Sequence, residues 1–101
     1  MATPATDAWP FPCPPDSPAF TSRGVADGSD WVQLVSRDAD DGAWQFHPQG
    51  PRVSYDEMTV LHLRCVVTLD RTLATLADLP RGWRASRVSP AAAWARFRLD
   101  D

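Results

Sequence analysis

The residues best suited to chemistry in this chain are two cysteines and two histidines: Cys13, His47, His62 and Cys65. His62 and Cys65 are three positions apart, and a thiol beside an imidazole is the arrangement of a nucleophilic dyad. Residues 59–67 are predicted to form a strand, however, on which an odd separation places two side chains on opposite faces. Cys65 would then point to the apolar face, where a buried thiol stays inert. The spacing therefore argues against a catalytic dyad.

Other catalytic and metal-binding patterns are missing from the sequence. The four Cys and His residues show none of the paired spacings of a zinc site, and two separate cysteines do not make a disulfide framework. The chain has no Gly-rich phosphate loop, no His-Glu-x-x-His and no Gly-x-Ser-x-Gly. We therefore expect no enzyme, no metal and no cofactor. The alternative is a small enzyme or ligand-binding domain with a pocket near His47 and His62.

Three acidic residues lie close together in the first half of the chain: Asp38, Asp40 and Asp41. A calcium loop that starts at Asp38 needs Gly at its sixth position and Glu at its twelfth, but Ala43 and Gln49 stand there. Asp and Gly are also turn residues, because Asp bonds the backbone two residues on and Gly accepts positive φ. Residues 39–42 are therefore predicted to close a hairpin between two apolar runs.

The basic residues, all ten of which are Arg, lie mostly in the last third of the chain. Residues 1–70 carry four Arg against ten acidic residues, a net charge of −6, and residues 71–101 carry six Arg against three Asp, a net charge of +3. The arginines that form a candidate interface are Arg81, Arg84 and Arg87, with Arg96 and Arg98 near them. Such a patch can bind an acidic partner or a phosphate. The alternative is a solvated face neutralised by Asp78 and the acidic turn.

Composition limits the classes of partner. The formal net charge of −3 over 101 residues argues against nucleic-acid binding, which needs a basic surface. The chain has no secretory signal and no run of the roughly 20 apolar residues that span a bilayer. We therefore expect a cytoplasmic protein that binds neither nucleic acid nor membrane.

Alternating apolar residues predict the strands. Residues 31–35 are rich in aromatic and β-branched side chains, and residues 59–67 give the strongest alternation in the chain. Trp44 and Phe46 fall on one face, which predicts a buried side of the sheet. Trp31 is predicted to face outward. A weaker strand at 20–26 would complete a three-stranded meander up to residue 47, and 83–88 is a possible last strand.

Two short helices are predicted after the strongest strand. Asp70 can cap the first by accepting a backbone N–H of its first turn, Leu73 and Leu76 follow at helical spacing, and Pro80 ends it. About eight residues are too few for a stable isolated helix, so packing on the sheet must hold it. Ser89 and Pro90 begin a second, Ala-rich candidate helix.

The domain organisation follows from the prolines. Residues 1–18 contain six of the ten prolines, which predicts an extended or disordered leader, although Trp9 and Phe11 would allow it to lie across the domain as an apolar strap. Residues 19–101 are then one α+β domain. We expect a four- or five-stranded, mainly antiparallel sheet with one or two short helices packed on one face.

Two segments resemble a family of small bacterial domains. Residues 41–46 (Asp-Gly-Ala-Trp-Gln-Phe), followed by Gly50, are similar to the family's Asp-Ser-Gly-Trp-x-Phe-x-x-Gly signature. Residues 69–82 are similar to its Asp-x-x-Ile/Leu…Pro-x-Gly segment. The resemblance covers roughly residues 21–87, and the family, of unknown function, is grouped with immunity proteins of polymorphic toxin systems. It implies no catalytic residues.

The resemblance implies a protein-binding module that neutralises a partner toxin by stoichiometric contact. Candidate interface residues are the acidic turn (Asp38, Asp40, Asp41), the arginines Arg81, Arg84 and Arg87, and Trp31. Tryptophan and arginine are enriched at the centres of protein interfaces, and acidic residues can steer a basic partner.

Overall fold

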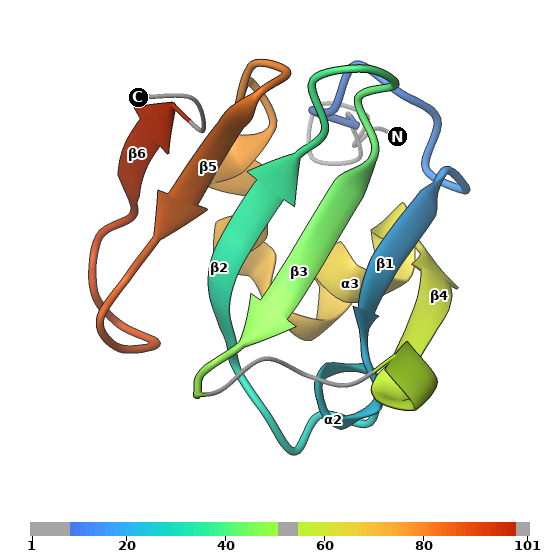
Figure 1. The fold of residues 1–101 in the computed structure, drawn as a ribbon, viewed down its shortest axis with the longest axis vertical. Helices are drawn as coiled ribbons and strands as arrows, with labels where there is room; N and C mark the ends of the chain where they lie inside the picture. Colours follow the sequence, from blue (N-terminus) through green and yellow to red (C-terminus); the bar gives the residue numbers. More distant parts are fainter. Residues whose placement is uncertain (1–8, 51–54, 99–101) are drawn as a thin grey trace, which may run out of the picture.

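Six strands form a single sheet in the computed structural model, which describes residues 9–50 and 55–98. The strands are β1 (Pro18–Ser22), β2 (Val32–Arg37), β3 (Trp44–Pro48), β4 (Met58–His62), β5 (Trp83–Ser86) and β6 (Ala95–Arg98). Their order across the sheet is β4-β1-β3-β2-β5-β6 (Figure 1). The α+β class is confirmed. The predicted number of four or five strands is wrong, because β6, whose residues were predicted to form a helix, adds a sixth strand at one edge of the sheet.

The sheet is mixed because β1 pairs parallel with β3, while the other four pairings are antiparallel. The predicted meander of three consecutive strands is therefore wrong. After β1 the chain turns into the short helix α2 (Arg23–Ala26), whose first turn is capped by Ser22 Oγ, which accepts the N–H of Val25 at 3.1 Å. This helical turn replaces the tight hairpin that a meander needs, and β2 then enters on the far side of β3.

The β2–β3 hairpin is formed as predicted. Arg37 pairs with Trp44, and Gly42 closes the turn at a φ of +72° that residues with a side chain rarely adopt. Trp44 and Phe46 are 2% and 1% exposed. The alternation read from the sequence therefore places both rings in the core.

The predicted strand at 59–67 ends at His62, and the chain continues as helix α3 (Leu63–Leu69). The N–H groups of Leu63 and Arg64 donate to the carbonyls of Ser17 and Pro15, at 2.8 and 2.9 Å. These carbonyls satisfy donors that a helix start leaves unpaired. Cys65 consequently lies exposed on α3, and the prediction that it is buried in a strand is wrong.

Asp70 caps the next element, the 3₁₀-helix η2 (Arg71–Leu76), by accepting the N–H of Thr72 at 3.0 Å. Leu73 and Leu76 are buried, as their spacing predicted, and Leu79 is buried as well. Another short 3₁₀-helix, η1 (Tyr55–Glu57), precedes β4. The helix predicted after Ser89–Pro90 is wrong, since its last residues form β6 and pair with β5.

Part of the Pro-rich leader belongs to the core. Phe11 is 6% exposed, and its ring meets the Trp44 ring edge-on with centroids 5.1 Å apart. Trp9 packs against the same cluster and donates from its indole to the Cys13 carbonyl. Residues 9–17 are thus the apolar strap and not a disordered leader; residues 1–8 lie outside the described residues. The core is completed by both sheet and helix residues: Ala19, Val25, Val32, Val35, Phe46, Leu63, Val66, Leu73, Leu76, Ala77, Leu79 and Ala85.

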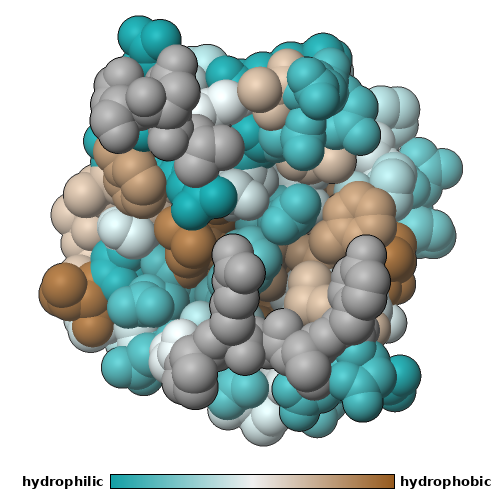
Figure 2. All heavy atoms as spheres, in the orientation of Figure 1, coloured by the Kyte–Doolittle hydropathy of each residue, from teal (hydrophilic) through white to brown (hydrophobic). Residues whose placement is uncertain are grey.

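The two faces of the sheet differ. Helix α3 and the segment η2 lie behind the sheet in Figure 1 and cover the face that carries Trp44 and Phe46. A row of residues in register crosses the opposite face through all six strands: Val60, Phe20, Gln45, Ser36, Arg84 and Phe97. Figure 2 shows that hydrophobic side chains form separate patches on this face, with hydrophilic ones between them. Within the described part, no helix is long and apolar enough to span a bilayer.

Candidate functional site

The predicted interface residues divide between the two ends of the sheet. The acidic turn connects β2 and β3 at the top of Figure 1, and the segment between α2 and β2 lies at the bottom. Trp31 is the last residue of that segment. Arg81 joins the acidic turn, because its Nη1 donates to the Asp40 carbonyl at 3.1 Å. Arg84 lies in register with Ser36 and Phe97 on the sheet face away from the helices. The structure therefore does not assemble these residues into one surface.

The acidic turn is held in one conformation by its own side chains. Asp38 Oδ1 accepts the N–H of Asp40 at 2.7 Å, and Asp41 Oδ1 accepts the N–H of Ala43 at 2.9 Å. Arg37 braces the turn through Nε, which donates to the Gly42 carbonyl at 3.3 Å. Asp40 and Asp41 remain exposed. A fixed pair of exposed carboxylates can act on a partner through its electric field without first losing conformational entropy.

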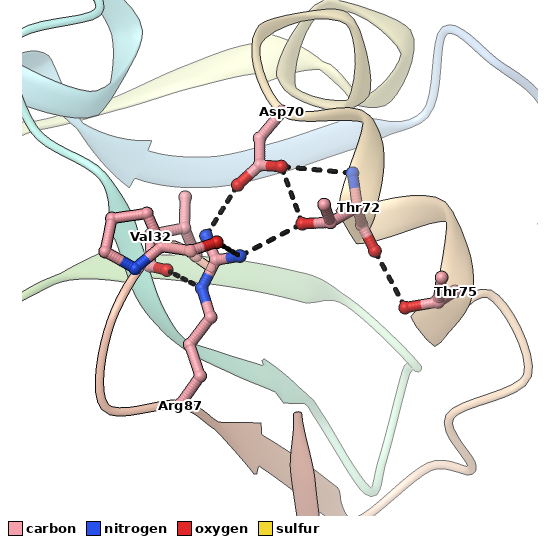
Figure 3. Close-up of polar contacts among 6 residues, drawn as sticks. Val32, Asp70, Thr72, Thr75 and Arg87 are labelled. Atoms are coloured by element: carbon pink, nitrogen blue, oxygen red, sulfur yellow. Dashed lines mark hydrogen bonds and ion pairs between the residues drawn. The ribbon is translucent and has the colours of Figure 1, made fainter. Parts of the chain in front are cut away.

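Arg87 contradicts its predicted place on an exposed basic patch, since it is 4% exposed. Its guanidinium donates four hydrogen bonds to groups that lie around it on β2, at the start of η2 and at Pro90 (Figure 3). Nε donates to the Val32 carbonyl at 2.9 Å, and Nη1 donates to Thr72 Oγ1 at 3.0 Å and to the Pro90 carbonyl at 3.1 Å. Nη2 forms an ion pair with Asp70 Oδ2 at 2.6 Å. Arg87 is thus a structural residue.

Two tryptophans complete the surroundings of this guanidinium. The Arg87 Cζ lies 4.3 Å from the ring centroid of Trp94 and 5.6 Å from that of Trp31. Both distances are within the roughly 6 Å of a cation–π contact. We name this arrangement the Arg87 cluster, comprising Trp31, Asp70, Thr72, Arg87 and Trp94. The cluster holds the Trp31 ring and the Asp70 carboxylate in place, and both side chains are partly exposed.

The ionisation of Asp70 depends on this cluster. Partial burial raises the pKa of Asp70, but hydrogen bonds from Thr72 and Arg87, together with the charge of Arg87, outweigh it and hold the pKa below the ordinary value of 3.8. A carboxyl whose pKa is lower in the folded than in the unfolded chain stabilises the fold above its unfolded pKa. This stabilisation is lost as the pH falls through the folded pKa.

We therefore expect Asp70→Asn to have a lower free energy of unfolding than the natural chain at neutral pH. The difference should shrink as the pH falls below 3.8. Urea denaturation at a series of pH values measures it. A difference that stays constant down to that range would show that the Asp70 charge does not contribute to stability.

A surface cleft of about 270 Å³ opens beside the Arg87 cluster. We call it the Trp31 cleft. Apolar and acidic residues both line it: Val25, Gly28, Ser29, Asp30, Trp31, Val32, Val66, Leu69 and Asp70. Val25, Val32 and Val66 are buried, whereas Asp30 is exposed and Asp70 is partly exposed. Leu69 is 49% exposed, a large value for a leucine beside the core. An apolar cavity with a few convergent polar groups is the usual form of a binding site.

The loop that forms one wall of the cleft is well fixed. The N–H groups of Ser29 and Asp30 both donate to the Gly24 carbonyl, at 2.9 and 3.0 Å. Asp27 Oδ1 accepts from Ser29 N and Ser29 Oγ at 2.9 and 2.7 Å, and these hydrogen bonds lower the pKa of Asp27. The Asp30 carboxylate lies against Gly24, where an added Cβ would be 2.0 Å from Asp30 Oδ2. The missing side chain of Gly24 therefore permits this position of Asp30.

The histidines of the alternative hypothesis lie apart. His62 pairs with Pro18 at the start of β1, and His47 follows Phe46, which pairs with Thr21 near the other end of β1. At the usual rise of a strand, this register separates the two histidines by roughly 13 Å along the strand direction. Neither histidine lines the Trp31 cleft. Among residues 9–50 and 55–98, no three His, Cys, Asp or Glu side chains form a group that could hold a metal ion.

Comparison with known proteins gives no match: no family model, no curated protein and no solved structure is similar to this chain at a significant level. The function must therefore be argued from the residues and the fold.

Sequence reasoning identified Trp31 but missed Asp30, Leu69 and Asp70 as its neighbours. Asp70 was predicted as a helix cap, which is correct but does not place it beside Trp31. Leu69 stands directly before Asp70, and no local pattern distinguishes an exposed leucine from a buried one. Two segments distant in sequence, residues 25–32 and 66–70, meet at the cleft, and no local pattern predicts such a meeting.

Proposed function

We propose that this chain is a non-catalytic protein-binding module of the immunity-protein type, which neutralises a partner toxin by stoichiometric binding. The observation that carries the proposal is the Trp31 cleft, which combines a tryptophan, an exposed leucine and two carboxylates. Tryptophan is enriched at binding hot spots, and carboxylates beside it can select a partner of opposite charge.

Preorganisation supports the same proposal. Trp31 is held by the Arg87 guanidinium, and the wall of the cleft is fixed by backbone hydrogen bonds to Gly24. A surface that is already ordered loses little entropy on binding, which favours tight association with a protein. The resemblance of residues 21–87 to immunity proteins points to a toxin as the partner.

The direct test is co-expression with the product of the gene immediately upstream of the one that encodes this chain. We expect that product to inhibit growth alone, and growth to return when this chain is made in the same cells. The two proteins should then purify as a complex of fixed stoichiometry. A neighbouring product that is harmless, or one that inhibits growth equally with this chain present, would contradict the proposal.

The acidic turn should affect the rate of association. We expect Asp40→Asn combined with Asp41→Asn to lower the association rate constant by roughly 3- to 10-fold at low ionic strength, because exposed carboxylates steer a basic partner before contact. Asparagine keeps the side-chain acceptor that bonds Ala43 N, so the turn should persist.

Surface plasmon resonance with the captured partner at two salt concentrations measures this effect. The difference between variant and natural chain should disappear at high salt, where exposed charges are screened. Equal association rates at low salt would exclude the acidic turn from the encounter.

A further inference from the structure

We infer that the Trp31 cleft receives an arginine side chain of the partner protein. This inference deepens the proposed function and rests on it, since it names the chemistry that the partner must present. The cleft has the three features that a guanidinium on an aliphatic stem requires: a flat aromatic ring, carboxylate oxygens and an apolar floor.

The charge of the cleft favours a cation. Asp30 and Asp70 both line it, and Arg87 neutralises only Asp70. Neither Arg23 nor Arg71, the basic residues nearest to it in sequence, is among the lining residues. A bound cation would therefore meet an uncompensated negative charge at the rim.

The carboxylate of Asp70 has acceptor capacity left. Its Oδ1 accepts from Thr72 N and Thr72 Oγ1, and its Oδ2 accepts from Arg87 Nη2. A carboxylate offers about four acceptor positions, so one of them remains for a ligand. Asp30, which also lines the cleft, is exposed and can supply a second, charge-assisted bond.

The chain itself contains an arginine that is bound by Trp31 and Asp70. Arg87 places its guanidinium against the Trp31 ring and bonds Asp70, and an external arginine would meet the same two groups from the solvent side. A planar guanidinium stacks on an indole and bonds carboxylates in its own plane, which a lysine ammonium does not do. The aliphatic stem would lie over Val25, Val66 and Leu69.

The size of the cleft fits one side chain. A volume of about 270 Å³ lies just below the roughly 300–1,000 Å³ of sites for drug-sized molecules. The occupant is therefore expected to be a side chain inserted from a larger surface and not a complete cofactor.

The test is a titration of the isotope-labelled full chain with N-acetyl-arginine amide, followed by NMR. N-acetyl-citrulline amide, which has the same shape without the charge, is the matched control. We expect the arginine compound to shift the Trp31 indole N–H and the Asp30 amide in a saturable manner, and the citrulline compound to leave both unchanged. Equal shifts with the two compounds, or none with either, would overturn the inference.

Two variants locate the site. Asp30→Asn should weaken binding of the arginine compound roughly tenfold, because it replaces a charge-assisted hydrogen bond by a neutral one. Gly24→Ala should weaken it similarly, since the added Cβ displaces the Asp30 carboxylate, while the fold is retained because alanine favours the α2 helix. Unchanged binding by both folded variants would place the ligand elsewhere and overturn the inference.

Three further outcomes distinguish the inference from its alternatives and from the proposed function. Tighter binding of free arginine than of the blocked compound would indicate a small-molecule ligand and overturn the assignment to a partner's side chain. A neutralised toxin together with no shift by the arginine compound would overturn the inference and leave the proposed function standing. Saturable binding without any neutralised toxin would support a guanidinium site and contradict the proposed function.

Discussion

Replacement of Arg87 by methionine is expected to lower the free energy of unfolding by about 3–5 kcal/mol, the usual cost of breaking a buried ion pair. Methionine keeps much of the aliphatic stem of arginine, so the loss of stability measures the contribution of the guanidinium. Without it, Asp70 keeps a partly buried charge, and the carbonyls of Val32 and Pro90 lose their donor. Small domains are stable by only about 5–15 kcal/mol, so the variant should unfold at much lower urea concentration.

The matched control is Arg96→Met, which removes an arginine–aspartate pair at the surface. Arg96 Nη2 lies 2.7 Å from Asp78 Oδ1, but the two side chains are 34% and 80% exposed. Exposed pairs contribute little to stability, because solvent screens the two charges. If the two variants lose equal stability in urea denaturation, the Arg87 cluster does not have the structural role described above.

The second large effect is expected from Trp44→Ala, which should cost about 3–5 kcal/mol, as large-to-small changes of buried aromatics do. Trp44 meets the Phe11 ring edge-on and stacks on Phe46 with centroids 6.3 Å apart. Its removal would open a cavity between the strap and the sheet.

Trp44→Phe is the informative control for this prediction. The indole Nε1 of Trp44 is buried and has no hydrogen-bond partner, so phenylalanine keeps an aromatic ring and removes an unsatisfied donor. We expect it to cost clearly less than alanine in the same urea denaturation experiment. A loss below about 1 kcal/mol for Trp44→Ala would contradict the central position of this ring.

Local chemistry predicted the parts of the fold that depend on neighbours in sequence. The Asp-Gly turn joined β2 to β3 because Gly42 takes a positive φ, and Asp70 capped a helical segment through its own carboxylate. The inward position of Trp44 and Phe46 followed from strand alternation. In each case, the relevant interaction lies within a few residues.

The errors occurred where distant segments decide the structure. Residues 59–67 alternate like a strand, but the carbonyls of Pro15 and Ser17 accept the first N–H groups of α3 and allow a helix to begin at Leu63. The Ala-rich stretch before Phe97 prefers a helix by propensity, yet β5 offers it an open edge and it pairs there as β6. Tertiary contacts outweighed local preference in both segments.

The candidate site was predicted only in part for the same reason. Trp31 and the acidic turn are visible as residue types, and both are at the surface or partly exposed. Arg87 was placed with the exposed arginines because no local pattern distinguishes a buried guanidinium from a solvated one. Its partners come from β2, η2 and the segment at Pro90, and only the three-dimensional structure brings them together.

The most direct test of the proposed Trp31 cleft as a partner-binding site is the affinity of Leu69→Arg for the partner protein isolated in the co-expression experiment, measured by isothermal titration calorimetry. Leu69 is the last residue of α3 and lines the cleft, so a cationic side chain there should fill the cleft and also suit the helix C-terminus. Val88→Arg is the matched control, since Val88 is exposed and is not a lining residue. We predict that Leu69→Arg abolishes binding while Val88→Arg binds like the natural chain. Unchanged affinity of a folded Leu69→Arg variant would contradict the account.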